Sequence, residues 1–167
     1  LALGWATFNG DHMSMYGTNG SVPKTLIRVL VGYEAKLYGE ELAEVLSDIL
    51  ATPVSPELLP SDDNAIAQKT EDIVGPYELH DFFLFYAVNY GYSPKKILTV
   101  AEQSFEVVYN KDIIKDWLKK FFSRFFAQQF KRSCLPDGPS VTSVNISSAG
   151  WKMPSDSCGA NWTDELN

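Results

Sequence analysis

Residues 110–129 read NKDIIKDWLKKFFSRFFAQQ, a run whose apolar side chains recur with the period of an α-helix. Asn110 is of a type preferred at the helix N-cap, so the helix is expected to begin after it and to run to about Gln129. One helix face is apolar and largely aromatic, which is typical of a core helix or of a subunit interface. Its members are Ile113, Ile114, Trp117, Leu118, Phe121, Phe122, Phe125 and Phe126.

Further helices are predicted on both sides of this run, each marked by a capping residue, an early proline or a following glycine. Residues 130–157 are expected to be irregular, because proline and glycine recur there. The expected helices are one opened by Ser21 and Pro23 with an apolar stripe of Leu26, Ile27, Leu30 and Val31, one over 40–50, one from Pro76 to Gly91, one opened by Ser93 and Pro94, and a short one over 159–166.

The start of the chain predicts a different element. Residues 1–8, LALGWATF, have the apolar character of a buried strand, and this abrupt apolar start predicts that further residues precede Leu1. Residues 9–22 and 51–75 are expected to be loops, the longer of a length that is usually functional or disordered. The fragment is therefore mainly helical by itself. We interpret residues 1–167 as the second half of an α/β domain whose parallel strands lie upstream.

Composition excludes several classes of protein. Hydrophobic residues make up 45% of the 167 residues and charged residues 21%, as in ordinary globular proteins. The net charge of −7 argues against a general nucleic-acid binder, and no apolar run approaches the roughly 18 residues of a membrane span. Cys134 and Cys158 fit reduced thiols, and without a CxxC pair or a His/Cys cluster no metal site is assigned.

Two candidate binding residues, Trp5 and Asp11, surround the end of the predicted strand. Open α/β sheets bind ligands where a strand ends in a polar, glycine-containing loop. Trp5 offers a flat apolar face to a base or a pyridine ring, and Asp11 offers a carboxylate to ribose hydroxyls. From these residues alone, a core tryptophan followed by a turn is the stronger interpretation.

Cations and hydroxyls elsewhere have similarly open interpretations. Lys24, at an expected helix start, suits a phosphate, or is simply solvated. Ser55 in the proline-containing loop contacts a nucleotide or forms a turn. Lys131 and Arg132 complement the negative end of a helix or reach a ligand. An acidic set that suits either Mg²⁺ held through water or a solvated face comprises Glu71, Asp72, Glu78 and Asp81.

The order of these segments resembles that of the NAD synthetases. The resemblance covers nearly the whole chain, and its C-terminal segments resemble the ending of the long, glutamine-dependent form. The segments, in order, are 1–8 followed by 10–11 (GD), 22–25 (VPKT), 55–58 (SPEL), 69–72 (KTED), 75–79 (GPYEL), 129–139 (QFKRSCLPDGP) and 150–156 (GWKMPSD).

This resemblance implies a fold, a reaction and a set of contacts. The fold is an adenine-nucleotide hydrolase-like, Rossmann-like α/β domain. The reaction is the amidation of deamido-NAD, in which ATP and Mg²⁺ adenylate the carboxylate and ammonia displaces AMP. An upstream glutaminase domain supplies the ammonia from glutamine. The implied contacts are Trp5, Phe8, Asp11 and Lys131 with deamido-NAD, and Lys24 and Ser55 with ATP.

Some parts of the family pattern are missing from the chain. The pyrophosphate loop, the Mg²⁺-binding glutamate and the glutaminase residues are expected upstream of Leu1, so the fragment is expected to be inactive alone. Phe130 stands where the short form has a histidine, so the role of that histidine does not transfer, and catalytic residues stay unassigned. The resemblance implies a cytoplasmic homo-oligomer. The alternatives are another ATP-dependent amidotransferase of the same fold and a non-catalytic helical interaction domain.

Overall fold

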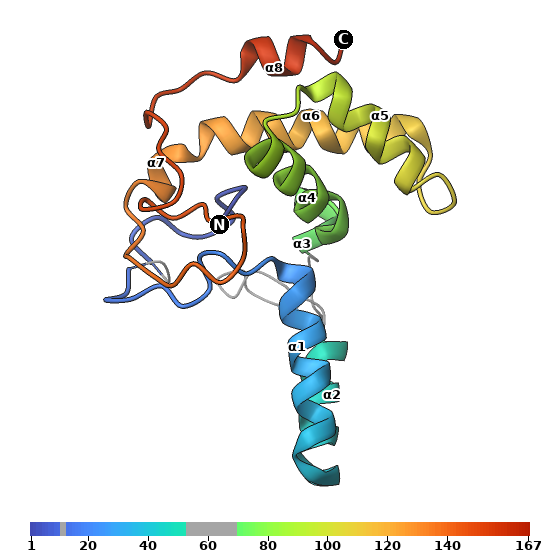
Figure 1. The fold of residues 1–167 in the computed structure, drawn as a ribbon, viewed down its shortest axis with the longest axis vertical. Coiled ribbons are helices and arrows are strands. Elements are labelled where there is room, and N and C mark those ends of the chain that lie inside the picture. Colours follow the sequence, from blue (N-terminus) through green and yellow to red (C-terminus); the bar gives the residue numbers. More distant parts are fainter. Residues whose placement is uncertain (11–12, 53–69) are drawn as a thin grey trace, which may run out of the picture. The chain divides into compact units, whose positions relative to one another are not determined.

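A computed structural model describes residues 1–10, 13–52 and 70–167, and within these ranges all regular structure is helical (Figure 1). The described residues form two compact units, which we treat separately. One comprises Leu1–Val22 and Leu79–Asn167, and the other comprises Pro23–Glu78. The predicted mainly helical character is confirmed.

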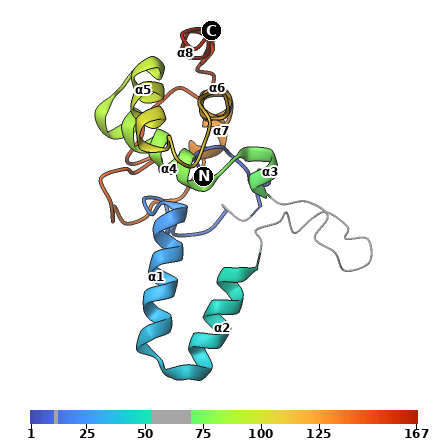
Figure 2. The same cartoon turned by 90° about the vertical axis from the view of Figure 1, so that its right-hand side faces the viewer.

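The aromatic helix predicted from residues 110–129 is the core of the larger unit. It forms α6 (Lys111–Ala127), and α5 (Pro94–Ser104) and α8 (Ala160–Asp164) pack against it. Figure 2 looks almost along the axis of α6 and shows α5 beside it. The buried face of the helix therefore serves as core. Its buried side chains are Ile114, Leu118, Phe121, Phe122 and Phe125.

Aromatic contacts tie α6 to segments far away in the sequence. The Phe121 ring lies 5.7 Å from that of Phe83. The Phe122 ring lies 5.1 Å from that of Trp162, and the Phe125 ring lies 5.7 Å from that of Trp151. Edge-to-face and tilted pairs at these distances add to the hydrophobic free energy of burial. One helix face thus gathers α4, α8 and the irregular C-terminal segment.

Helix boundaries in the larger unit follow the predicted signals. Residues 76–91 form α4 (Tyr77–Leu84), which continues into the π-helical turn η2 (Phe85–Asn89), and Gly91 follows with φ +62°. Ser93 precedes α5 as its N-cap residue. The predicted last helix is confirmed as α8, and the chain between α7 (Gln129–Arg132) and α8 is irregular.

The smaller unit contains the two predicted helices, α1 (Lys24–Leu37) and α2 (Gly39–Ala51), which pack together as a helical hairpin. Gly39, with φ +68°, makes the reversal between them. The Arg28 guanidinium donates to the Leu50 carbonyl across the pair (3.1 Å). Neither helix contains a buried residue, so many apolar side chains of the hairpin are exposed. The unit also contains α3 (Thr70–Val74), where the sequence predicts loop.

The predicted strand over residues 1–8 is wrong. These residues form turns, and only Leu3 and Gly4 are buried. The described ranges contain no strand with which residues 1–8 could pair. The backbone carbonyls of the segment therefore accept hydrogen bonds from other donors. Gly4 lies at φ +58°, which a regular strand does not allow.

The predicted cap role of Ser21 is also wrong. Pro23 is the N-cap residue of α1. The Ser21 hydroxyl instead donates to the Pro139 carbonyl (3.0 Å) and accepts from the Val141 amide (2.6 Å). Ser21 therefore joins the start of the chain to its C-terminal segment, a long-range pairing that local sequence does not encode.

Two further findings concern the cysteines and the apolar character of the helices. Cys134 and Cys158 are free and exposed, as predicted for reduced thiols. Among the helices that the structure describes, none is both long and apolar enough to cross a membrane.

We expect Asn110→Ala to lower the free energy of unfolding by about 1 kcal/mol, because the Asn110 carboxamide caps α6. Its oxygen accepts from the amides of Asp112 (2.7 Å) and Ile113 (3.3 Å). Ser93→Ala is the matched control, since the Ser93 side chain makes no cap hydrogen bond at α5. Urea titration of the intact protein measures both, and equal losses would contradict the assignment.

Candidate ligand-binding site

Three cations from the end of α6 and from α7 hold the N-terminal segment by its backbone. Each donates to carbonyl oxygens within residues 2–6, which a strand would have bonded to its neighbours. The bonds are Arg124 Nε to Leu3 O (3.1 Å), Lys131 Nζ to Gly4 O (2.8 Å) and Ala6 O (2.7 Å), and an Arg132 terminal nitrogen to Ala2 O. Charge-assisted hydrogen bonds of this kind are stronger than neutral ones.

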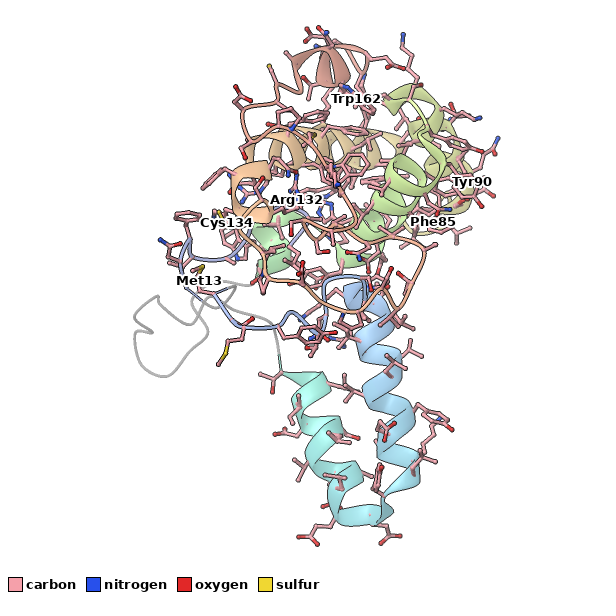
Figure 3. All side chains as sticks on the ribbon, turned by 60° about the vertical axis from the view of Figure 1, so that its left-hand side comes forward. Met13, Phe85, Tyr90, Arg132, Cys134 and Trp162 are labelled. Atoms are coloured by element: carbon pink, nitrogen blue, oxygen red, sulfur yellow. The ribbon has the colours of Figure 1, made fainter. Side chains whose placement is uncertain are left out.

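Arg132 is the most buried of the three cations, with 1% of its surface exposed. Its guanidinium also donates to the Gln129 side chain (3.1 Å) and to the Phe125 carbonyl, and lies 4.2 Å from the Phe125 ring centroid. Burial lowers its pKa to about 10, so the group stays charged at neutral pH. Figure 3 shows Arg132 among the side chains of the larger unit.

The other two cations border the surface. Burial lowers the pKa of Arg124. Burial and the positive charge of Arg124 lower the pKa of Lys131. Among the described residues, the acceptors of these two cations are backbone carbonyl oxygens, which carry no full negative charge. The cluster therefore keeps a net positive potential that favours an anionic ligand group nearby.

Three partly exposed aromatic rings accompany these cations. Trp5, Phe8 and Phe130 are 38%, 44% and 38% exposed. The Arg124 guanidinium lies 5.3 Å from the Trp5 ring, and the Phe8 and Phe130 rings lie 5.4 Å apart at 51°. We call Trp5, Phe8, Phe130, Arg124 and Lys131 the aromatic-cationic patch. Flat apolar faces beside positive charge suit a planar ring that carries an anionic group.

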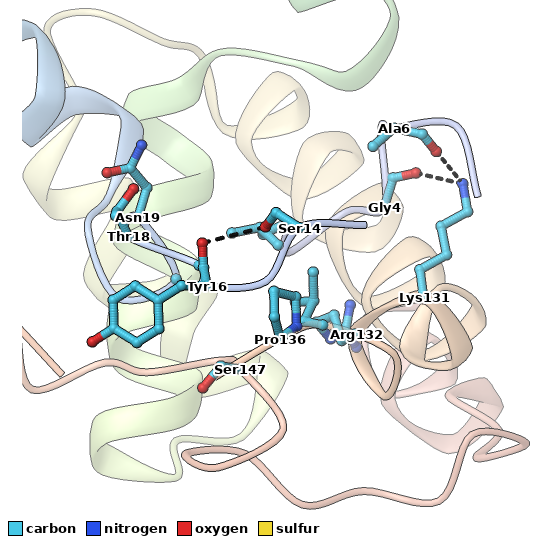
Figure 4. A pocket seen from close by; sticks show the side chains of 14 residues that line it. Gly4, Ala6, Ser14, Tyr16, Thr18, Asn19, Lys131, Arg132, Pro136 and Ser147 are labelled. Carbon is cyan, nitrogen blue, oxygen red and sulfur yellow. Dashed lines mark hydrogen bonds between the residues drawn. The ribbon is translucent and has the colours of Figure 1, made fainter. Parts of the chain in front are cut away.

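A cavity of about 310 Å³ lies against the same N-terminal segment (Figure 4). This volume is at the lower end of the range for small-molecule sites. Lys131 and Arg132 line it, and no acidic side chain is among its lining residues in the described ranges. The other lining residues come from the start of the chain, from the glycine-containing loop 14–20 and from the C-terminal segment: Leu1, Gly4, Ala6, Ser14, Tyr16, Gly17, Thr18, Asn19, Gly20, Leu135, Pro136 and Ser147.

The structure brings together three of the six predicted binding residues. Trp5, Phe8 and Lys131 meet in the aromatic-cationic patch. Lys24 is the first residue of α1 in the other unit, with its ammonium 5.8 Å from the Tyr77 ring centroid. Asp11 and Ser55 lie outside the described residues. The ligand roles of all six stay predictions.

Sequence analysis missed Phe130 and Arg124 as members of this patch. Phe130 belongs to the aromatic run that the sequence favours as core or subunit interface and stands where the short form has a histidine, although its place beside Lys131 is a usable signal for the patch. Arg124 lies in the last turn of α6, before Lys131 in the chain. The local sequence around Arg124 does not indicate that its hydrogen-bond partner is the Leu3 carbonyl. Only a contact between residues 121 positions apart brings it to the site.

The acidic residues do not gather into a metal site within the described ranges, where no group of three or more His, Cys, Asp or Glu side chains is found. Glu71 has a local role instead, because its carboxylate accepts from the Tyr77 amide at the start of α4 (3.0 Å). His80 is buried among aromatic rings, stacked 6.1 Å from that of Phe121. These positions favour structural roles for both residues.

Several curated proteins are similar in sequence to this chain over all or nearly all of its length. A Mycobacterium tuberculosis protein named glutamine-dependent NAD(+) synthetase is 38% identical over 189 aligned residues, which cover 100% of this chain and 28% of that protein. Its Mycobacterium leprae counterpart is 37% identical over 188 residues, covering 99% of this chain and 28% of that protein. The chain is similar throughout to the C-terminal part of glutamine-dependent NAD(+) synthetases. The sequence-based resemblance is thus confirmed.

More distant NAD(+) synthetases extend the comparison. The Aquifex aeolicus glutamine-dependent NAD(+) synthetase is 25% identical over 153 residues, which cover 92% of this chain. A crystal structure of the Cytophaga hutchinsonii glutamine-dependent NAD(+) synthetase matches with a TM-score of 0.70 at 21% identity, over 99% of this chain and 24% of that one. The fold is therefore that of the matching part of this synthetase. No protein-family model matches, and the chain spans 28% of the length of the mycobacterial relatives.

We expect Gly4→Ala to destabilise the protein more than Gly39→Ala does. Both glycines have positive φ, +58° and +68°, so alanine costs about 1–2 kcal/mol of backbone strain at either position. A Cβ on Gly4 would also collide with the Gln128 side chain, whereas nothing lies within 4 Å of a Cβ on Gly39. Urea unfolding of both variants compares the losses. A Gly4→Ala loss no larger than that of Gly39→Ala would show that the turn yields easily.

Proposed function

We propose that the chain is the C-terminal part of an enzyme that amidates deamido-NAD to NAD, with ammonia derived from glutamine. The observation that carries the proposal is the 38% identity, over the whole chain, to proteins named glutamine-dependent NAD(+) synthetases. The aromatic-cationic patch supports it, because deamido-NAD combines flat heteroaromatic rings with phosphates and a carboxylate. The chain spans 28% of those relatives, so the complete activity requires residues outside it.

The proposed reaction has two steps. The nicotinate carboxylate of deamido-NAD attacks the α-phosphorus of ATP, which forms an acyl adenylate and releases pyrophosphate. Ammonia then attacks the acyl carbon, AMP leaves, and the new carbon–nitrogen bond is the amide of NAD. Both steps require the reacting groups to be held in line and the phosphate charge to be neutralised.

Within this scheme the chain supplies binding groups. The faces of Trp5 and Phe8 contact a ring of deamido-NAD, and Lys131 belongs to the same site. Lys24 would neutralise charge on the ATP phosphates from the first turn of α1. Asp11 and Ser55 complete the proposed set as contacts to deamido-NAD and to ATP. The described residues hold no cluster fit for Mg²⁺, so its ligands are proposed to lie in the rest of the enzyme.

The remaining expectations belong to the same proposal. Residues 1–167 form the C-terminal part of a synthetase domain of the Rossmann-like class, whose pyrophosphate loop lies elsewhere in the enzyme, as does the glutaminase domain. The fragment is inactive alone, and the enzyme is a cytoplasmic homo-oligomer. The mainly helical structure of this portion is compatible with a half-domain from which the strands are missing.

The test is an assay of the complete enzyme for ATP-dependent conversion of deamido-NAD to NAD. Glutamine and ammonium are supplied in separate reactions, and NAD and AMP are both quantified. We expect NAD with either nitrogen source. NAD with ammonium alone would retain the ligase and remove the glutaminase. No NAD from folded enzyme would contradict the proposal and favour another ATP-dependent amidotransferase or a helical interaction domain.

We expect Trp5→Ala and Lys24→Ala to have opposite kinetic signatures. Trp5→Ala removes the ring face proposed to stack on deamido-NAD. The KM for deamido-NAD should rise about tenfold, in line with the roughly 1–3 kcal/mol of a stacked ring, and the KM for ATP should change little. Lys24→Ala should mainly lower kcat, because charge grows on the phosphates in the transition state. Steady-state kinetics with each substrate varied measures both, and each variant is the control for the other. Equal KM changes for both substrates in Trp5→Ala, or unchanged kcat in Lys24→Ala, would refute the respective role.

A further inference from the structure

Lys131 bridges the two backbone carbonyls on either side of Trp5. Its ammonium has three N–H donors, and two of them reach Gly4 O at 2.8 Å and Ala6 O at 2.7 Å. Figure 4 shows both bonds converging on the Lys131 nitrogen. One charged group from α7 therefore holds the Gly4–Trp5 peptide group, just before Trp5, and the Ala6–Thr7 peptide group, one residue beyond it.

We propose that Lys131 is a positioning residue, which fixes the partly exposed Trp5 indole for ligand binding by holding the backbone on both of its sides. This proposal rests on the proposed function only in naming deamido-NAD as the ligand. It differs from a direct contact with the substrate, which the family resemblance implies for Lys131. The ammonium already has two acceptors from its own chain, and they are next to the residue that meets the ligand.

The neighbouring contacts support this role. Backbone hydrogen bonds close the turn from Leu1 to Gly4 (3.1 Å) and the turn from Thr7 to Gly10 (3.0 Å). Lys131 ties together the residues between those turns. Without strand pairing, a segment held by so few bonds has little else to restrict its φ and ψ angles.

Adjacent side chains hold the same segment from both ends. Arg124 bonds the Leu3 carbonyl (3.1 Å) and lies 5.3 Å from the Trp5 ring centroid. Phe130, next to Lys131, packs on Phe8 with ring centroids 5.4 Å apart. Among these three side chains, Lys131 alone bonds backbone carbonyls on both sides of Trp5. Loss of its ammonium should therefore loosen Trp5 and leave the flanking contacts in place.

The first experiment measures backbone order without ligand. Hydrogen–deuterium exchange is followed by mass spectrometry in the intact enzyme, for wild type, Lys131→Met and Lys131→Arg. In Lys131→Met we expect the Gly4 amide, which donates to the Leu1 carbonyl beside the Lys131 bonds, to exchange about tenfold faster, the factor for one lost hydrogen bond to a charged group. Lys131→Arg keeps a charged donor and should recover most of the protection. Lys152→Met, at an exposed lysine of the same C-terminal segment, should leave the exchange unchanged.

The second experiment is a double-mutant cycle with Trp5. Lys131→Met, Trp5→Ala and the double variant are compared by KM for deamido-NAD. If Lys131 acts through Trp5, its removal should raise KM about tenfold in the wild type and less than twofold in Trp5→Ala, because residues that act together are not additive. Additive effects, together with unchanged exchange in ligand-free Lys131→Met, would assign Lys131 to direct contact and overturn the proposal.

The outcomes separate this proposal from the proposed function. Exchange requires no turnover, so faster exchange in an enzyme that forms no NAD would retain the positioning role and remove the reaction. Should Lys131→Met not fold, amine labelling of the wild type replaces it. Lys131 should then react at least about tenfold more slowly than Lys152 before any ligand is added, because two acceptors hold its ammonium. Equal reactivity of the two lysines would overturn the positioning role.

Discussion

Hydrogen bonds from buried and half-buried cations to backbone carbonyls are the interaction on which the site depends. Residues 1–8 have no strand partner in the described ranges, yet Leu3 and Gly4 are buried. A buried carbonyl without a donor costs a large part of the stability of a small domain. Arg124, Lys131 and Arg132 supply the donors, each from a rigid helical position. Desolvation of these cations lowers their pKa values. The hydrogen bonds to the carbonyls offset the free energy lost in desolvating the charges.

Helix α6 connects this interaction to the hydrophobic core. Its buried face holds Phe121 and Phe125 among the rings of neighbouring segments. Its last turn and the adjoining α7 carry the cations, so the position of the cations follows from core packing. Gly4 completes the arrangement, because a side chain there would meet Gln128, which lies between α6 and α7. A change in the core would therefore reach the segment around Trp5 through the side chains of Arg124 and Lys131, which bond its backbone carbonyls.

The similarity to glutamine-dependent NAD(+) synthetases fits the chemical character of the aromatic-cationic patch. The patch presents aromatic faces and positive charge on a helical scaffold, and the proposed reaction requires both for binding its ligands. Lys131 holds the carbonyls of Gly4 and Ala6, the residues on either side of Trp5. If Trp5 binds a ligand as proposed, such preorganisation would reduce the entropy lost on binding.

Local sequence determined most of the helices, because their signals act over only a few residues. The Asn110 cap, the early Pro94 and the period of the aromatic run placed α5 and α6, and the order of short segments was enough to indicate the synthetase family. Local sequence also suggested Trp5 and Lys131 separately, each with more than one role, and the family resemblance added Phe8. Tertiary structure decided that residues 1–8 form turns, that Ser21 bonds the C-terminal segment, and that Arg124 and Phe130 belong to the patch. The physical reason is that hydrogen-bond donors more than a hundred positions away replace a strand's partners, and no periodicity in the first eight residues records which donors those are.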